Sequence, residues 1–188
     1  MDQLNPTESL EIISKAIHQT KENFKEQVVY FILWGWVSLI ASIINYYLAA
    51  HTSFQYPYLP WLILVPIALI FHFRIEKKQG KAKKIQSYYD LYLKYLWSVL
   101  GGSFIAIIIY TSYFDIPPTS FLLLLAGMGT LITGLTIEFK PISWGGLALL
   151  LFSFVALFVS PSQTLLVYCL AIILGYLVPA YMLGKDKK

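Results

Sequence analysis

The side chains that could do chemistry are few and widely spaced along this 188-residue chain. The three histidines, His18, His51 and His72, are not neighbours in the sequence. The metalloprotease pattern H-E-x-x-H, the G-x-S-x-G nucleophile elbow, the Walker loop and a paired-carboxylate motif are all absent from it. A single cysteine, Cys169, cannot form a multi-cysteine metal site within one chain. We therefore expect no cofactor and no metal, and an enzyme is the least favoured class.

A second kind of candidate is polar residues placed inside long apolar segments. The candidate intramembrane site consists of Asn45, Thr130, Thr133 and Glu138. Asn45 shares a helical face with Ser38 and Ser42, and the threonines follow the small residues 126–129. In lipid, such residues gather where helices touch, so a helix contact is favoured and a polar path for a solute is the alternative. Glu138, near Lys140, is interpreted as a surface carboxylate in preference to a proton-coupling group.

The N-terminal segment carries the signals of an amphipathic helix. Asn5-Pro6-Thr7-Glu8 places a cap, a proline and a capping-box glutamate in the order that starts a helix. Apolar residues then recur at helical spacing, and this apolar side could lie on the membrane face, pack under the bundle or pair with another protein. A coiled coil is disfavoured, because the segment holds only about two heptads.

A basic cluster downstream completes a candidate docking surface. Six Lys and Arg side chains lie between residues 74 and 84, where they suit a protein partner or anionic lipid headgroups. The candidate docking or lipid-contact residues are Ile13, Ile17, Phe24, Arg74, Lys77, Lys78, Lys81, Lys83 and Lys84.

Composition indicates the solvent in which these residues must be positioned. Hydrophobic residues make up 57% of the chain and charged residues 13%, against about 25% charge in an ordinary soluble domain. Residues 28–50 carry no charge at all, and a bilayer-spanning helix needs about 20 apolar residues. The prediction is an all-α polytopic membrane protein.

Charges, prolines and polar clusters divide the chain into six expected transmembrane helices. A cytoplasmic amphipathic helix over 1–27 precedes a transmembrane domain over 28–184, and a basic tail covers 185–188. The expected spans lie near 28–50, 57–73, 93–113, 118–137, 142–159 and 163–183.

The distribution of positive charge predicts the orientation. With six spans and both termini in the cytoplasm, all 14 Lys and Arg residues fall on the cytoplasmic side, as the positive-inside rule requires. Insertion and anionic headgroups thus explain the net charge of +4, and we expect no nucleic acid partner.

The expected spans also pair into three similar hairpins. Each first helix carries a tryptophan near its cytoplasmic start, and each return helix opens with proline, which is tolerated at a first helical turn. The tryptophans are Trp34, Trp97 and Trp144, and the prolines are Pro57, Pro60, Pro117, Pro118 and Pro161.

Several segments resemble a known group of proteins. Leu33-Trp34-Gly35-Trp36, Lys94-Tyr95-Leu96-Trp97 and the stretch 129–141, with Gly145-Gly146, resemble small six-helix membrane proteins found in Bacteroidota. The likeness extends over most of the chain. It implies a bacterial inner-membrane location, and it transfers no activity and no functional residue, since no activity is established for that group.

Three functions follow as hypotheses. The first is a non-enzymatic scaffold or regulatory protein that docks a cytoplasmic protein partner or anionic lipid. The second is a small transporter or channel using a polar path along spans one and four, as a homo-oligomer because six short helices leave limited room. The third is a membrane-embedded enzyme acting on a lipid-like substrate.

Overall fold

The chain folds into a bundle of helices, which confirms the all-α prediction. The computed structural model describes residues 6–79 and 88–185, and within these ranges the regular secondary structure is helical. The elements are α1 (Pro6–His51), α2 (Leu59–Gln79), α3 (Tyr88–Tyr113), α4 (Thr119–Thr136), α5 (Lys140–Val155), α6 (Pro161–Ile172), the π-helical segment η2 (Ile173–Leu177) and α7 (Val178–Lys185). Because α6, η2 and α7 follow one another without a break, they form a single rod.

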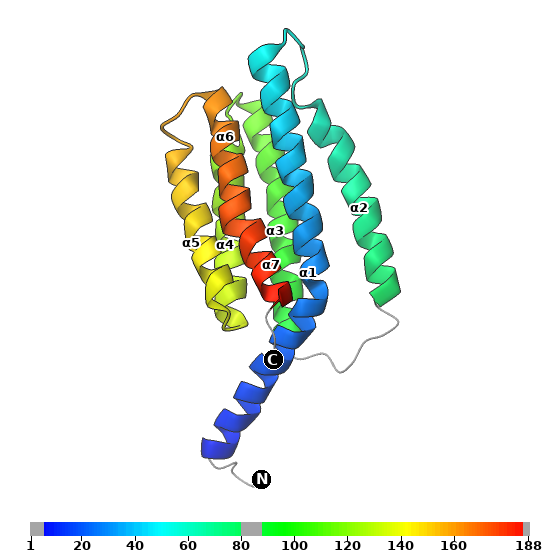
Figure 1. The fold of residues 1–188 in the computed structure, drawn as a ribbon, viewed down its shortest axis with the longest axis vertical. Helices are drawn as coiled ribbons and strands as arrows, with labels where there is room; N and C mark the ends of the chain where they lie inside the picture. The colour runs from blue at the N-terminus through cyan, green and yellow to red at the C-terminus, as the bar shows by residue number, and fades with distance from the viewer. Residues whose placement is uncertain (1–5, 80–87, 186–188) are drawn as a thin grey trace.

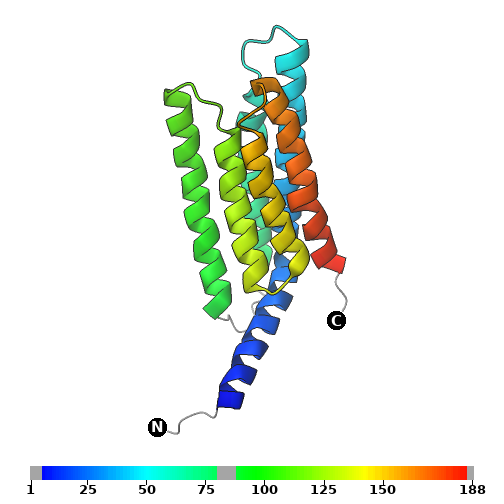
Figure 2. The ribbon, with the colours of Figure 1, turned by 90° about the vertical axis from the view of Figure 1, so that its left-hand side faces the viewer.

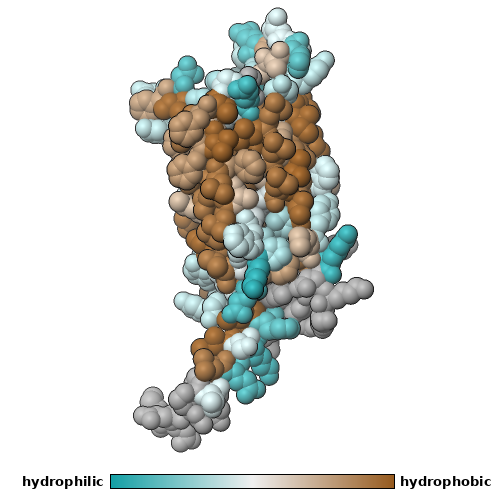
Figure 3. All heavy atoms as spheres, turned by 60° about the vertical axis from the view of Figure 1, so that its left-hand side comes forward, coloured by the Kyte–Doolittle hydropathy of each residue, from teal (hydrophilic) through white to brown (hydrophobic). Residues whose placement is uncertain are grey.

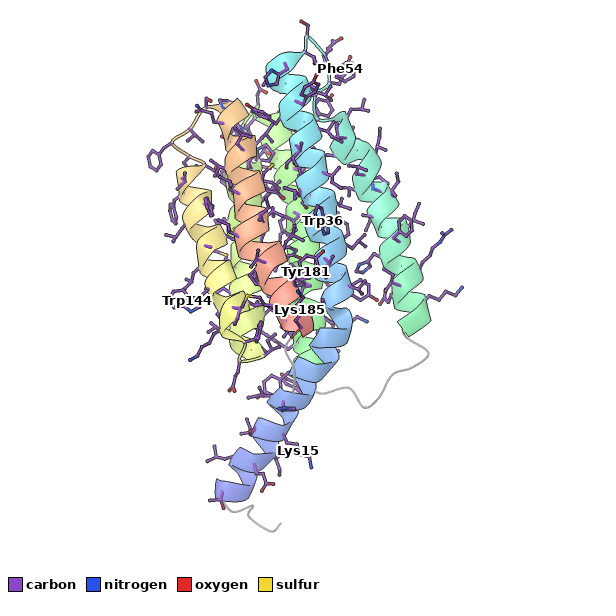
Figure 4. The ribbon with its side chains drawn as sticks, viewed as in Figure 1. Lys15, Trp36, Phe54, Trp144, Tyr181 and Lys185 are labelled. Atoms are coloured by element: carbon purple, nitrogen blue, oxygen red, sulfur yellow. The ribbon has the colours of Figure 1, made fainter. Side chains whose placement is uncertain are left out.

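Rods that follow one another in the chain run in opposite directions (Figures 1 and 2). The last turn of α2, the first turn of α3, the α4–α5 turn and the last turn of α7 all lie at the lower end of the bundle in Figure 1. The α1–α2 connection, which contains Phe54, lies at the opposite end (Figure 4). The described part of the chain therefore begins and ends on one side of the bundle.

One continuous helix joins the predicted amphipathic segment to the first predicted span. As the Asn5-Pro6 motif predicts, α1 begins at Pro6, and it continues for 46 residues with no break between residues 27 and 28. At 1.5 Å per residue its length is about 69 Å, more than twice the roughly 30 Å of a bilayer's hydrocarbon core. The N-terminal part consequently projects well below the other helices (Figure 1).

Glycines bring α4 and α5 into the closest helix contact of the bundle. A Cβ atom added to Gly134 would lie 2.7 Å from Ser143 Oγ, and one added to Gly146 would lie 2.6 Å from Leu131 Cα. Neither position has space for a larger side chain, because the backbone of the facing helix occupies it. The interpretation of the small residues in α4 as a helix contact is thus confirmed.

The π-helical segment η2 lies where the α6–η2–α7 rod contacts both α5 and α1. Pro179 has no backbone N–H, so the Gly175 carbonyl lacks the donor that a regular α-helix would supply. That carbonyl faces Gly145 of α5, and the next two residues, Tyr176 and Leu177, lie against Gly35 of α1. The extra residue of a π turn lets consecutive side chains face both helices.

The outer surface is mainly apolar. The face of the bundle seen in Figure 3 carries a broad hydrophobic band, with hydrophilic atoms gathered toward its two ends. Large apolar side chains are exposed on several helices, including Leu62 (65% exposed), Ile105 (63%) and Leu151 (68%). A contiguous apolar surface of this extent indicates contact with lipid.

Five segments of the described chain are long and apolar enough to cross a membrane. They are Val28–His51, Leu59–Lys77, Leu91–Tyr113, Thr119–Thr136 and Gln163–Lys185. The segment expected at 142–159 corresponds to α5, which is shorter, with 16 residues. After Val155 the backbone tightens into turns closed by bonds from Leu157 N to Phe154 O and from Phe158 N to Val155 O, and the α-helix does not continue to Pro161.

Candidate functional site

Asn45 fastens α1 to the beginning of α2. With the amide turned so that its oxygen faces Trp61, Asn45 donates to the Pro57 carbonyl (2.9 Å) and accepts from Trp61 Nε1 (3.2 Å). Both the N–H and C=O sides of the amide are then used in holding two helices together. The arrangement favours the helix-contact interpretation of Asn45 over a solute site.

Thr133 has a similar role between α3 and α4. Its Oγ1 accepts a hydrogen bond from Trp97 Nε1 (3.1 Å) and donates to the Gly129 carbonyl one turn earlier (2.7 Å). The side chain is completely buried. Its hydroxyl is therefore engaged on both sides and has little capacity left for a solute.

Two other hydroxyls are buried without a partner. Thr130 Oγ1 in α4 and Ser42 Oγ in α1 have no hydrogen bond, although both residues are completely buried. A buried hydroxyl that makes no hydrogen bond destabilises a fold by about 1–3 kcal/mol. Among the side chains that the structure describes, these are the two buried polar atoms without a hydrogen-bond partner.

The four predicted intramembrane residues do not converge. Asn45 is bonded to the start of α2, at the end of the bundle where α1 and α2 are connected. Thr133 is bonded to Trp97, near the opposite end. Glu138 lies beyond the end of α4, exposed, in the left-handed backbone region with φ of 52°. The structure thus brings Thr130 and Thr133 together on one helix and leaves Asn45 and Glu138 apart from them.

A contact that sequence reasoning missed joins α1 and α2 near the lower end of the bundle. Trp34 Nε1 donates to His72 Nδ1 (3.3 Å), and the Tyr30 ring lies 4.6 Å from the His72 ring, centre to centre. Along the sequence, Trp34 lies as many residues before Ser53, in the α1–α2 connection, as His72 lies after it. Trp97 and Thr133 are placed in the same way before and after Asp115, between α3 and α4. This signal is weak, because the counts match only when Ser53 and Asp115 are taken as the centres of connections that contain several residues.

The structure describes only some of the residues of the predicted docking surface. Ile13 is 46% exposed, Ile17 is half-buried, and Arg74 and Lys77 are exposed at the end of α2. The side chains of Phe24 and Lys78, and the whole of Lys81, Lys83 and Lys84, lie outside the described residues. Leu10 (66% exposed) and Ile12 (56%) add to the apolar surface of the projecting helix.

The described residues contain no group of three or more His, Cys, Asp or Glu side chains that could hold a metal ion. No protein-family model, curated protein or solved structure matches the chain. Its function must therefore be argued from its own geometry.

Proposed function

We propose that the chain is a bacterial inner-membrane protein with six spans and both ends in the cytoplasm, and that it docks a cytoplasmic protein through residues 6–27 of α1, here called the α1 extension. α5 completes the six spans in this proposal. The lower end of the bundle is assigned to the cytoplasm, because the expected cytoplasmic segments, with all the Lys and Arg residues, adjoin helix ends on that side.

The observation that supports docking is an apolar helix surface outside the bundle. The α1 extension is about 33 Å long, and Figure 4 shows Lys15 on it, well below the other helices. Leu10 and Ile13, three residues apart and therefore on one face, are 66% and 46% exposed. Water disfavours such a surface, and an amphipathic helix is a common element of protein recognition.

Charge favours a protein over the lipid surface as the occupant of the α1 extension. Residues 1–27 contain five carboxylates and three lysines, so the segment is net acidic. An anionic leaflet attracts basic segments and repels acidic ones. The end of α2, with Arg74 and Lys77, is the better match for lipid headgroups, and we assign anionic lipid contact to it.

Site-specific photocrosslinking tests this proposal. A crosslinking amino acid at Ile13, on the apolar face, should give one defined protein adduct in cells, whereas the same amino acid at Lys15 should give none. Leu10→Gln should abolish the Ile13 adduct and leave the melting temperature unchanged. Adducts only to lipid at Ile13, or equal protein adducts at both positions, would refute docking by this face.

The contacts of the candidate residues inside the bundle support neither the transporter nor the enzyme hypothesis. A polar path along α1 and α4 would need Asn45 and Thr133 free for a solute, and both are occupied by helix-to-helix hydrogen bonds. An enzyme would need ionisable groups in proximity, and His72 has an indole and a phenol ring as its neighbours. Docking is therefore the function that the geometry supports best.

A further inference from the structure

The outward side of α5 carries an apolar groove. It has a volume of about 330 Å³ and is lined by Trp144, Leu147, Ala148, Leu150, Leu151 and Phe154. We call it the α5 groove. Since α5 is at the edge of the bundle and Trp144 projects away from the other helices, the groove faces the hydrocarbon of a surrounding bilayer (Figure 4).

Trp144 differs from the other four tryptophans because its indole N–H makes no hydrogen bond to a described residue. Trp34, Trp36, Trp61 and Trp97 each donate to a side chain, namely His72, Tyr181, Asn45 and Thr133. Trp144 has no hydrogen-bond partner in the part of the chain that the structure describes, and it is 69% exposed. An indole donor turned toward lipid without an acceptor is unfavourable, so it is available to a ligand oxygen.

A cation lies directly below the tryptophan. Lys140 and Trp144 are four residues apart on α5, so their side chains share a face, and both are exposed. Lys140 makes no ion pair with any described carboxylate, including the nearby Glu138. The backbone contributes little here, because Pro141 has no N–H and the amides of Ile142 and Ser143 both donate to the Phe139 carbonyl. The positive charge of the site is the Lys140 ammonium.

The dimensions of the groove match one lipid leaflet. From Trp144 to Phe154 the helix rises by about 15 Å. Half of a hydrocarbon core of roughly 30 Å is also about 15 Å. The groove thus extends from the level of the headgroups to the middle of the membrane, the depth over which one acyl chain lies.

We propose that Lys140, Trp144 and the α5 groove bind one anionic phospholipid of the cytoplasmic leaflet. The Lys140 ammonium binds the phosphate, the Trp144 N–H donates to a phosphate or ester oxygen, and an acyl chain packs along the groove. A second copy of the chain fits less well, because a twofold axis along the membrane normal would place two Lys140 ammonium groups at the same depth. This site is separate from the α1 extension, so it does not depend on docking of a protein there.

Native mass spectrometry of the full chain, released from nanodiscs of phosphatidylglycerol and phosphatidylcholine, tests the site. The wild type should retain one phosphatidylglycerol in preference to phosphatidylcholine. Lys140→Gln should lower this preference about five-fold, the usual contribution of one lysine near an anionic surface, and Lys140→Arg should preserve it. Trp144→Phe, which keeps an aromatic ring but removes the N–H, should lower the retained amount of both lipids about two-fold and leave the preference unchanged, because both carry the phosphate and ester oxygens to which the N–H donates.

Lys94→Gln is the matched control, since Lys94 is an exposed lysine near the corresponding end of α3. It should leave the preference unchanged. The proposal is refuted if Lys94→Gln and Lys140→Gln have equal effects, or if inorganic phosphate displaces the bound lipid, which would indicate a general anion site. It is refuted as well if the α5 variants change the oligomeric state while lipid retention stays the same.

Discussion

Thr130→Val and Thr133→Val make the same chemical change on one helix, yet they should shift the free energy of unfolding in opposite directions. Both side chains are completely buried in α4. The Thr133 hydroxyl has two hydrogen bonds, to Trp97 and Gly129, and the Thr130 hydroxyl has none. Valine has nearly the shape of threonine, so the packing is preserved and the hydroxyl is the main difference.

The expected magnitudes follow from these contacts. Side-chain hydrogen bonds within membrane proteins contribute about 0.6 kcal/mol on average and about 1.7 kcal/mol at most. Thr133→Val also leaves the Trp97 N–H without its acceptor; because Trp97 is only half-buried, the total loss should be about 1–2 kcal/mol. Thr130→Val removes an unpaired buried hydroxyl and should raise the free energy of unfolding by up to about 1 kcal/mol.

Reversible unfolding in mixed micelles, titrated with a denaturing detergent, measures both variants against the wild type. The two should differ by about 1–3 kcal/mol, with Thr133→Val the less stable. Equal destabilisation by both substitutions would refute the hydrogen-bond assignment on α4. A transport activity lost equally in both variants would instead favour a polar path along this helix.

Three further predictions concern packing and topology. Gly146→Ala should destabilise the bundle by about 1–3 kcal/mol, because the new methyl group would overlap Leu131 of α4, whereas Gly102→Ala, at an open helical site, should be neutral or stabilising by up to about 1 kcal/mol in the same titration. Trp61→Phe removes the donor to Asn45 and should increase hydrogen exchange in α2 more than in α4, as mass spectrometry would detect. A cysteine at Phe54 should react with a membrane-impermeant thiol reagent added outside intact cells; protection there would contradict the proposed orientation.

The helices themselves could be predicted because the bilayer imposes their length and composition. Apolar runs, with prolines at their beginnings, located α4 and the α6–η2–α7 rod within a few residues. Charge was a poorer guide to where a helix ends. The second span was expected to stop at residue 73, but α2 continues to Gln79, because Arg74 and Lys77 can extend into water from a helix that has not ended.

The partners of the polar residues could not be predicted, because they depend on how each helix is rotated and at what depth it lies. The spacing of Ser38, Ser42 and Asn45 correctly indicated one protein-facing side of α1. It gave no sign that Asn45 would bond to Trp61 while Ser42 would have no partner. Likewise, the tryptophan pattern marked Trp97 and Trp144 as equivalent, although one is bonded to a threonine and the other faces outward.

The brevity of α5 has a consequence for the membrane itself. A helix of 16 residues is about 24 Å long, several ångströms less than an average hydrocarbon core. If α5 crosses the bilayer, as proposed above, the hydrocarbon layer beside it must become thinner, at a modest energetic cost per ångström of mismatch. The helices α1, α2 and α3 and the α6–η2–α7 rod are long enough to impose no such deformation. The protein should therefore thin the bilayer on one flank only, and this asymmetry would concentrate it in regions where the membrane is already thin.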